Sequence, residues 1–288
     1  MTNTTDIAAV TALDVPRSVA VVPRRSRPLR RRRLGPRRRI PFSSVIGPLV
    51  VLAVWSIASA TGVLDWRTLP APWTVVTEGA SLWRNGTLAP DIVISLQRAA
   101  LGFLAGASSG IVLALISGLS RVGEALIDST VQLKRAIPSL GMIPLFILWL
   151  GIGEGFKVAI IAIGVFVPIY LNLSSALTGL DNRYVELAEV LRLSRWQFLR
   201  KVVFPGALPG LFVGLRLGVV GSWLSLVVLE QINATSGLGY MMFQATNYGQ
   251  TDIICVGLAI YGIFGLISDR LVRLAERRVL SWRRTLNS

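Results

Sequence analysis

The sequence contains no histidine, a single cysteine and only three lysines, and each scarcity excludes a class of site. Without histidine the chain has no imidazole general base and no Cys/His metal site, and with Cys255 alone it has no internal disulfide. None of the three lysines, Lys134, Lys157 and Lys201, follows a glycine. A Walker A phosphate loop requires the pair Gly-Lys, so any ATP that drives this protein is bound by a separate polypeptide. We therefore expect no catalytic residue, no metal site and no cofactor on this chain.

Charged residues are also scarce, at 16% of the chain against about a quarter in ordinary soluble domains. Hydrophobic residues make up 52%, and several apolar runs approach the length of about 20 residues that spans a bilayer. The composition predicts an all-α fold, a polytopic membrane helix bundle. An integral-membrane enzyme is the weaker alternative, because the acidic residues are scattered singly rather than clustered near one membrane face.

The formal net charge of +15 is distributed in a way that indicates membrane topology. Ten arginines lie between Arg24 and Arg39, and most of the others flank hydrophobic runs. Basic residues in such positions set the orientation of membrane spans and contact anionic lipid head groups. We therefore expect membrane lipid as a contact and no nucleic acid, with nucleic-acid binding by the basic tail as the alternative.

The first 90 residues divide into a tail, a helix and a loop. Residues 1–39 form an Arg-rich cytoplasmic tail whose composition predicts disorder. Residues 40–60 form the first transmembrane helix; a cleavable signal peptide, including the twin-arginine kind, is the alternative, since the run ends in Ala-Ser-Ala. Residues 61–90 form an extracytoplasmic loop, with a short interfacial helix over Thr74–Arg84.

Residues 91–272 form the transmembrane core, and residues 273–288 form a basic cytoplasmic tail. The second span contains Gly102, Gly106 and Gly110, a spacing that allows another helix backbone to approach closely. The third span is interrupted by proline and glycine. The five spans expected in the core lie at about 94–117, 138–150, 156–177, 208–229 and 253–271.

The placement of arginine predicts the orientation of the spans. The two tails and the segments 120–135 and 183–201 are basic, whereas the loops 61–90, 151–155 and 230–252 are not. About six transmembrane helices with both termini cytoplasmic satisfy the positive-inside rule at every loop. The sequence has no internal repeat, so any two-fold symmetry must come from a second subunit.

The polar segment 181–209, between two apolar runs, is amphipathic and helix-forming on both sides of an expected turn. A connector between two spans needs only a few polar residues, so this patterned length predicts a docking surface, with an ordinary interfacial helix as the alternative. The segment resembles the EAA loop of ATP-binding-cassette importer permeases. Glu186 and Ala188 match the start of that loop, the run from Ser194 to Gln197 follows, and Pro205 and Pro209 end it.

The resemblance extends over residues 69–283 and is specific to the aliphatic-sulfonate, taurine and nitrate group of importer permeases. Each matching piece is weak alone, and their order along the chain carries the resemblance. The pieces are Leu69-Pro-Ala-Pro72, Ser95-Leu-Gln-Arg98, Arg135-Ala-Ile-Pro138, Leu148-Trp-Leu-Gly-Ile-Gly153, Gly214-Leu-Arg-Leu-Gly218, Ser236-Gly-Leu-Gly-Tyr240, Thr251-Asp252 and Leu274-Ala-Glu-Arg-Arg278.

The resemblance implies a type I importer permease (MetI-like) architecture in a bacterial plasma membrane. The implied partners are two ATP-binding-cassette ATPase subunits that bind ATP and Mg²⁺, a second permease copy and an extracytoplasmic solute-binding protein. An aliphatic sulfonate or taurine is the expected substrate, otherwise nitrate or a similar small solute. A secondary transporter or channel without ATPase subunits is the alternative, and it would have charged or unwound midplane sites in paired halves.

The resemblance also implies roles in coupling to the ATPase subunit. Glu186 would be the anion of the contact, Arg192 and Arg195 its cations, and Trp196 and Phe198 its apolar anchors. Ala188, Ser194 and Gln197 complete the expected coupling set. Two residues depart from the family pattern: Leu187 replaces an alanine, and Arg192 replaces the glycine that would ease the turn between the two short helices.

Polar residues within the spans suggest a possible translocation path. Asn172, Ser174 and Ser175 lie in the fourth span, where they line such a path or form interhelical hydrogen bonds. Arg216, in the fifth span, could contact an anionic substrate there. We expect Arg98 and Arg216 to serve the structure instead, because both lie close enough to a span end for their side chains to snorkel.

Overall fold

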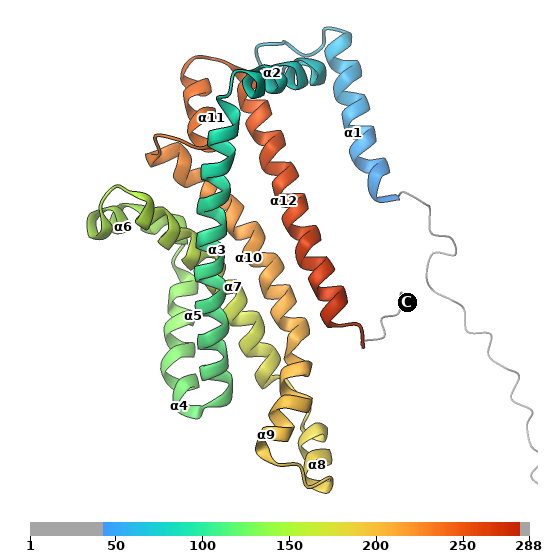
Figure 1. The fold of residues 1–288 in the computed structure, drawn as a ribbon, viewed down its shortest axis with the longest axis vertical. Helices are drawn as coiled ribbons and strands as arrows, with labels where there is room; N and C mark the ends of the chain where they lie inside the picture. Colours follow the sequence, from blue (N-terminus) through green and yellow to red (C-terminus); the bar gives the residue numbers. More distant parts are fainter. Residues whose placement is uncertain (1–42, 283–288) are drawn as a thin grey trace, which may run out of the picture. The chain divides into compact units, whose positions relative to one another are not determined.

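The protein is described by a computed structural model over residues 43–282, and every regular element in that range is helical (Figure 1). The chain divides into residues 1–49 and residues 50–288, and what is described of the first part is the opening of α1 (Ser43–Ala60). The expected disordered tail, residues 1–39, and the last six residues of the basic C-terminal tail lie outside the described range.

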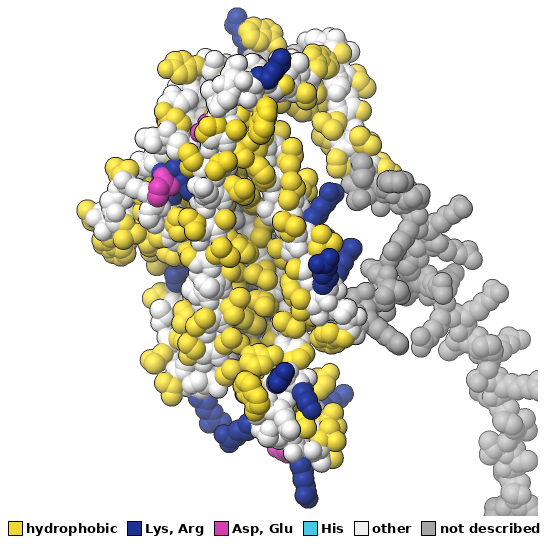
Figure 2. All heavy atoms as spheres, viewed as in Figure 1, with side chains coloured by type: hydrophobic (Ala, Val, Ile, Leu, Met, Phe, Trp, Pro, Cys, Tyr) yellow, Lys and Arg dark blue, Asp and Glu magenta, His cyan; other side chains and the backbone are white. Residues whose placement is uncertain are grey.

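Four helices of the second part are long and apolar enough to cross a membrane. They are α3 (Leu88–Leu119), α7 (Glu154–Thr178), α10 (Phe204–Asn233) and α12 (Thr251–Val279). Both α3 and α10 pack along α7, and α12 packs against α10. Hydrophobic side chains cover the visible flanks of this bundle, as expected of helices that face lipid (Figure 2).

Helix α7 forms the centre of the bundle because it is covered on two sides. Its side chains Ile160, Ile161, Val165 and Ile169 are fully buried. Their spacing covers a face wider than one apolar stripe, as a helix between two neighbours requires. The core of the bundle therefore lies along α7.

The predicted close approach at the glycines of the second span is confirmed, and the neighbour is α7. A Cβ at Gly106 would overlap the carbonyl of Ala162, and one at Gly110 would lie 3.1 Å from the Phe166 carbonyl oxygen. α10 approaches an adjoining face of α7 in the same way, where a Cβ at Gly214 would lie 2.8 Å from Cα of Ile169. Close backbone packing of this kind holds helices together where lipid leaves no hydrophobic force between them.

The third expected span is a bent pair of helical segments. Its first arm consists of α4 (Arg121–Gly123), the π-helix η1 (Glu124–Asp128) and α5 (Ser129–Ala136). Its second arm consists of the 3₁₀-helix η2 (Ser139–Met142) and α6 (Ile143–Leu150), and the two arms meet at 89°. Pro138 lies at the bend, where a helix cannot continue because proline disfavours α-helical backbone in the preceding residue.

The number of spans therefore stays a prediction. Within residues 46–282 the structure has four candidate spans, or five if the bent pair counts as one. The apolar stretch of α1 in that range, Ile46–Ala60, is shorter than these. Each of the six expected spans corresponds to a helical element, but length and composition qualify at most five.

Two expected loops contain helices. The predicted interfacial helix is present as α2 (Pro72–Arg84), which begins two residues before the expected start. The 230–252 loop contains α11 (Leu238–Asn247), a helix that the sequence analysis did not identify. Leu238, Met242 and Ala245 are buried at helical spacing, so packing against α10 and α12 stabilises this short helix.

The segment 181–209 forms two short helices and the start of a long one, as predicted. The helices are α8 (Asn182–Val190) and α9 (Arg195–Phe198), followed by the π-helix η3 (Leu199–Val203) and then α10. The α8–α9 hairpin, defined here as residues 181–198, lies at the end of the bundle that also carries α4 (Figure 1).

The glycine contact between α3 and α7 predicts a specific packing defect. Gly106→Ala should lower the free energy of unfolding by about 1–3 kcal/mol, because the new methyl group overlaps the α7 backbone. The matched control is Gly262→Ala in α12, where an added Cβ has no atom within 4 Å. Thermal unfolding of the detergent-purified variants checks this. Equal midpoints for both variants would contradict close α3–α7 packing.

Candidate functional site

The α8–α9 hairpin begins each of its helices with a side-chain cap. The Asp181 carboxylate accepts the N–H of Arg183 at 3.0 Å and caps α8. Ser194 and Gln197 form a capping box at α9: Ser194 Oγ accepts the Gln197 N–H at 3.3 Å, and Gln197 Oε1 accepts the Ser194 N–H at 3.0 Å. These two residues, expected in the coupling set, therefore shape the hairpin through local hydrogen bonds.

The turn between α8 and α9 has the left-handed backbone conformation that glycine usually adopts at this position. Arg192 has φ 50°, in the left-handed region, and its N–H donates to Glu189 O at 3.0 Å. The N–H of Leu193 donates to Ala188 O at 2.9 Å. This pair of bonds is a Schellman motif, whose left-handed position is usually glycine. The turn therefore forms although arginine replaces the family's glycine at position 192. Arg192 adopts a conformation that is unfavourable for a residue with a Cβ.

The surface of the hairpin is apolar and exposed. Trp196 is 65% exposed and Val190 80%, and Leu187 and Leu191 are exposed as well. Clustered exposed apolar side chains usually mark a contact with a protein or a membrane. The two expected anchors differ, because Phe198 is half-buried against the protein's own core while Trp196 points outward.

The charged members of the coupling set lie beside these apolar side chains. Glu186, Arg192 and Arg195 are all exposed. Among residues 43–282 none of them forms an ion pair within 4.0 Å. Ala188 is buried, and its small side chain and its carbonyl both belong to the turn. The hairpin thus presents free charge and apolar surface together.

The hairpin is continuous with the core of the bundle. Residues Arg195–Asn233 form one helical stretch of 39 residues that includes α9, η3 and α10. Because α10 packs along α7, continuous backbone joins α9 to the centre of the protein.

The structure does not bring the four residues of the possible translocation path together. Asn172 and Ser175 line an open hollow of about 420 Å³, together with Arg135. Ser174 is buried in the bundle and does not line it. Arg216 lies elsewhere, with its Nε 3.2 Å from the Asp269 carboxylate on α12.

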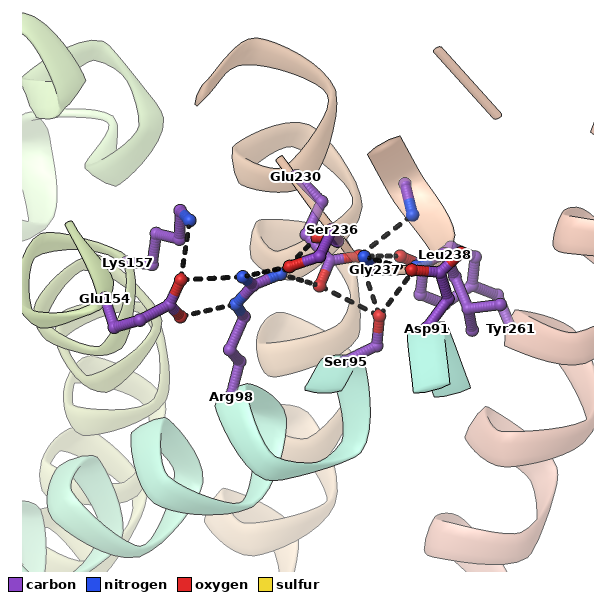
Figure 3. Close-up of polar contacts among 11 residues, drawn as sticks. Asp91, Ser95, Arg98, Glu154, Lys157, Glu230, Ser236, Gly237, Leu238 and Tyr261 are labelled. Atoms are coloured by element: carbon purple, nitrogen blue, oxygen red, sulfur yellow. Dashed lines mark hydrogen bonds and ion pairs between the residues drawn. The ribbon is translucent and has the colours of Figure 1, made fainter. Parts of the chain in front are cut away.

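A buried charge network lies at the other end of the bundle, and the sequence analysis missed it (Figure 3). Arg98 on α3 donates from Nη1 to Glu230 Oε1 at 2.7 Å, and from Nε and Nη2 to the two oxygens of Glu154 at 2.5 and 2.7 Å. Its side chain is 4% exposed. The expectation that Arg98 snorkels to water was therefore wrong, because two acids distant in the sequence meet it inside the protein.

Glu230 joins four helices at this point. Besides Arg98, its carboxylate accepts the Ser95 hydroxyl at 2.8 Å, the Gly239 N–H at 2.9 Å and the Tyr261 hydroxyl at 2.9 Å. These donors come from α3, α11 and α12, and Glu230 itself lies on α10. The carboxylate is fully buried, and this number of donors is what a buried charge requires.

Comparison with known proteins agrees with the resemblance seen in the sequence. The family model "Binding-protein-dependent transport system inner membrane component" matches residues 110–281. The chain is 42% identical to the putative aliphatic sulfonates transport permease protein SsuC of Escherichia coli (strain K12), over 82% of this chain and 89% of that one. It is 39% identical to the protein of the same name in Bacillus subtilis (strain 168), over 82% and 86%.

A relative with another substrate in its name and one solved structure extend the comparison. Identity to the taurine transport system permease protein TauC of Escherichia coli (strain K12) is 32%, over 82% of this chain and 88% of that one. A crystal structure of an amino acid ABC transporter with histidines matches with a TM-score of 0.58 at 19% identity, over 69% of this chain and 97% of that chain. At this identity the structural match establishes the fold alone.

The left-handed Arg192 predicts that glycine would stabilise the hairpin turn. Arg192→Gly should raise the local stability of residues 186–195 by about 1 kcal/mol, because glycine adopts positive φ without steric cost. Hydrogen–deuterium exchange of the Leu193 amide measures this as slower exchange. The control, Leu191→Gly at φ −80°, should exchange faster. Faster exchange in both variants would mean that a contact of the Arg192 side chain outweighs the backbone cost.

Proposed function

The chain belongs to the family of binding-protein-dependent transport system inner membrane components, and we propose that its α8–α9 hairpin is the site where an ATPase subunit docks. It is the integral inner-membrane permease subunit of an ATP-binding-cassette importer. The family membership favours this function over a secondary transporter or channel. The observation that supports the docking site is that the hairpin is exposed and partly apolar, and that its second helix continues into α10 of the core.

The hairpin has the composition of an interface centre. Trp196 supplies a large aromatic side chain, and such residues commonly contribute much of the binding energy of an interface. Val190 and Leu191 extend the apolar area beside it. Glu186 and Arg195 supply charges of both signs, which fix the orientation of a partner more than they add affinity.

The continuous helix explains how docking could move the transport path. ATP-driven closure of two ATPase subunits would displace α9, and the stretch Arg195–Asn233 would carry that displacement into α10. The close contact between Gly214 and α7 would then pass it across the bundle, because there is no gap to absorb it. Alternating access follows when two permease copies, each with its own ATPase subunit, move together.

The orientation of the chain follows from its charge. Basic side chains gather at the end of the bundle that carries α4 and α8, and along the last turns of α12 (Figure 2). By the positive-inside rule we propose that this end is cytoplasmic, and the arginines of the N-terminal tail and of the last turns of α12 support cytoplasmic termini. The Arg98 network then lies at the extracytoplasmic end, where a solute-binding protein would deliver its cargo.

The substrate proposed for this importer is an aliphatic sulfonate. The relatives named for sulfonates are 42% and 39% identical to this chain, against 32% for the taurine permease and 30% for a nitrate import permease of Synechococcus elongatus. Taurine is itself an aminosulfonate. A sulfonate group is thus the chemical feature shared by the more similar named relatives.

Dependence on a separate ATPase is the first test of this function. The chain, expressed with its cognate ATPase subunit, should co-purify with that subunit. Uptake of ethanesulfonate into vesicles should require ATP. The partner subunit should bind that ATP, because this chain has no Gly-Lys phosphate loop of its own. Uptake that continues with a catalytically inactive ATPase, driven by an ion gradient alone, would contradict the proposal.

Charge reversal at Glu186 tests the docking site. Glu186→Lys should reduce ATPase retention at least about 100-fold. In the docked complex Glu186 would pair with a cation of the ATPase subunit, and breaking such a buried charge pair costs about 3–5 kcal/mol. Glu186→Ala should reduce retention less. Retention and uptake are measured at matched membrane levels. The control is Glu124→Lys, an exposed glutamate at the same end of the bundle but outside the hairpin. Equal retention by Glu186→Lys and the control would remove the hairpin as the docking site.

A further inference from the structure

Glu154 is the exposed member of an otherwise buried charge cluster. Its side chain is 60% exposed, whereas the Arg98 and Lys157 side chains that it contacts are each 4% exposed. Lys157 Nζ donates to Glu154 Oε1 at 2.9 Å, and Arg98 holds both oxygens of the same carboxylate. A solvent-accessible carboxylate therefore covers two buried cations (Figure 3).

The backbone that carries Glu154 has room to move. Glu154 lies between Gly153 and Gly155, and Gly151 before them has φ 74°. A Cβ at any of these three glycines would have no atom within 4 Å, apart from chain neighbours and, for Gly155, its own helix. The segment is thus free of side-chain packing on that side, and glycine gives its backbone a wide choice of conformations.

The other carboxylate of the cluster is fixed. Glu230 is fully buried and accepts hydrogen bonds from Ser95, Arg98, Gly239 and Tyr261. Its release would leave several buried donors unsatisfied, whereas release of Glu154 would expose an acid to water and free the two cations. Of the two carboxylates paired with Arg98, Glu154 is the replaceable one.

Charge balance defines what can replace it. The four side chains joined by ion pairs are Arg98, Lys157, Glu154 and Glu230, two cations and two anions. Asp91 lies nearby, but its described contact is the Gly237 N–H, at 2.7 Å. When Glu154 leaves, one positive charge is uncompensated among the paired side chains. A monovalent anion that takes the place of the Glu154 carboxylate keeps the charge of the whole cluster, Asp91 included, unchanged.

We propose that Arg98 and Lys157 form a binding site for a monovalent oxyanion that displaces Glu154, and that a sulfonate group is its occupant. This inference rests on the proposed function and names the place where the permease contacts the substrate. The Nε and Nη2 atoms of Arg98 already hold two oxygens as a fork. Glu154 must share Oε1 between Arg98 and Lys157, whereas a sulfonate has a third oxygen to offer Lys157 separately.

Ser236 adds a neutral group to the same site. Its hydroxyl lies 3.3 Å from Arg98 Nη2, and its carbonyl accepts from Arg98 Nη1 at 2.7 Å. The carbonyl keeps Arg98 in place when Glu154 leaves, and the hydroxyl can donate to an incoming oxygen. In the proposed orientation the site faces the extracytoplasmic side, so that Glu154 covers it until a solute-binding protein delivers the anion.

The test measures anion binding by the purified complex of permease and ATPase subunits in nanodiscs. The midpoint of thermal unfolding is followed against the concentration of ethanesulfonate, because a ligand that binds the folded state raises it. Glu154→Gln should lower the half-saturating concentration about tenfold by removing the competing carboxylate, and Lys157→Gln should raise it about tenfold by removing a charged donor. Glu78→Gln on α2, a glutamate outside the network, should leave it unchanged.

Two further ligands define the chemistry of the site. Ethyl methyl sulfone, which is neutral and has two sulfur-bound oxygens, should not shift the midpoint. Nitrate is a monoanion with three oxygens, so binding of nitrate alone, weakened by Lys157→Gln, would support the oxyanion site and overturn the sulfonate as its occupant. A half-saturating concentration that is the same in Glu154→Gln and the unsubstituted protein would overturn the site itself.

The same samples separate this inference from the proposed function. Each preparation is assayed for bound ATPase subunit and for ATP hydrolysis. If the ATPase is retained and no anion shifts the midpoint, the anion site falls and the importer function stands. If the tagged permease retains no ATPase subunit on purification and the anions still raise its midpoint as expected, the importer function and its docking site are contradicted and the anion site stands. If Lys157→Gln fails to fold, the change in half-saturating ethanesulfonate concentration in Glu154→Gln still tests the anion site.

Discussion

The architecture depends on the contact of α7 with two glycine-bearing helices, α3 and α10. Gly106 of α3 and Gly214 of α10 bring their backbones against α7, where no side chain could be accommodated. In lipid the association of helices relies on such packing and on polar contacts, because hydrocarbon surrounds the apolar side chains whether or not the helices meet. A bundle held in this way has little empty space between its helices, so the helices shift as rigid units rather than deform.

One helix connects the two functional regions that we infer. The stretch Arg195–Asn233 begins at the hairpin proposed to bind the ATPase and ends three residues beyond Glu230. Glu230 in turn holds Arg98, the arginine of the proposed oxyanion site. Movement at the hairpin would therefore have a direct route to the residues that would contact substrate. The buried network supplies what such a route needs, a rigid connection among α3, α10, α11 and α12 at its far end.

The sequence indicated most of the helices because hydrophobic length and arginine placement are local signals. It also located the α8–α9 hairpin and its turn, including the residue that stands where glycine is usual. It did not yield α11, whose ten residues fold only against their neighbours, or the network around Arg98. Arg98 was recognised as a charge near a span end, but its pairing with Glu230 depends on segments 132 positions apart. No spacing rule relates residues that distant.

By itself the sequence determined that this is a helical membrane protein without a Gly-Lys phosphate loop, because composition, dipeptides and the order of short motifs need no tertiary contact. The tertiary structure decided which charges are buried together, which face of α7 meets which glycine, and that Phe198 packs inward while Trp196 does not. The reason is physical: burial and ion pairing are properties of pairs of segments, and the free energy of a buried charge is set by partners that only the folded chain brings within about 3 Å.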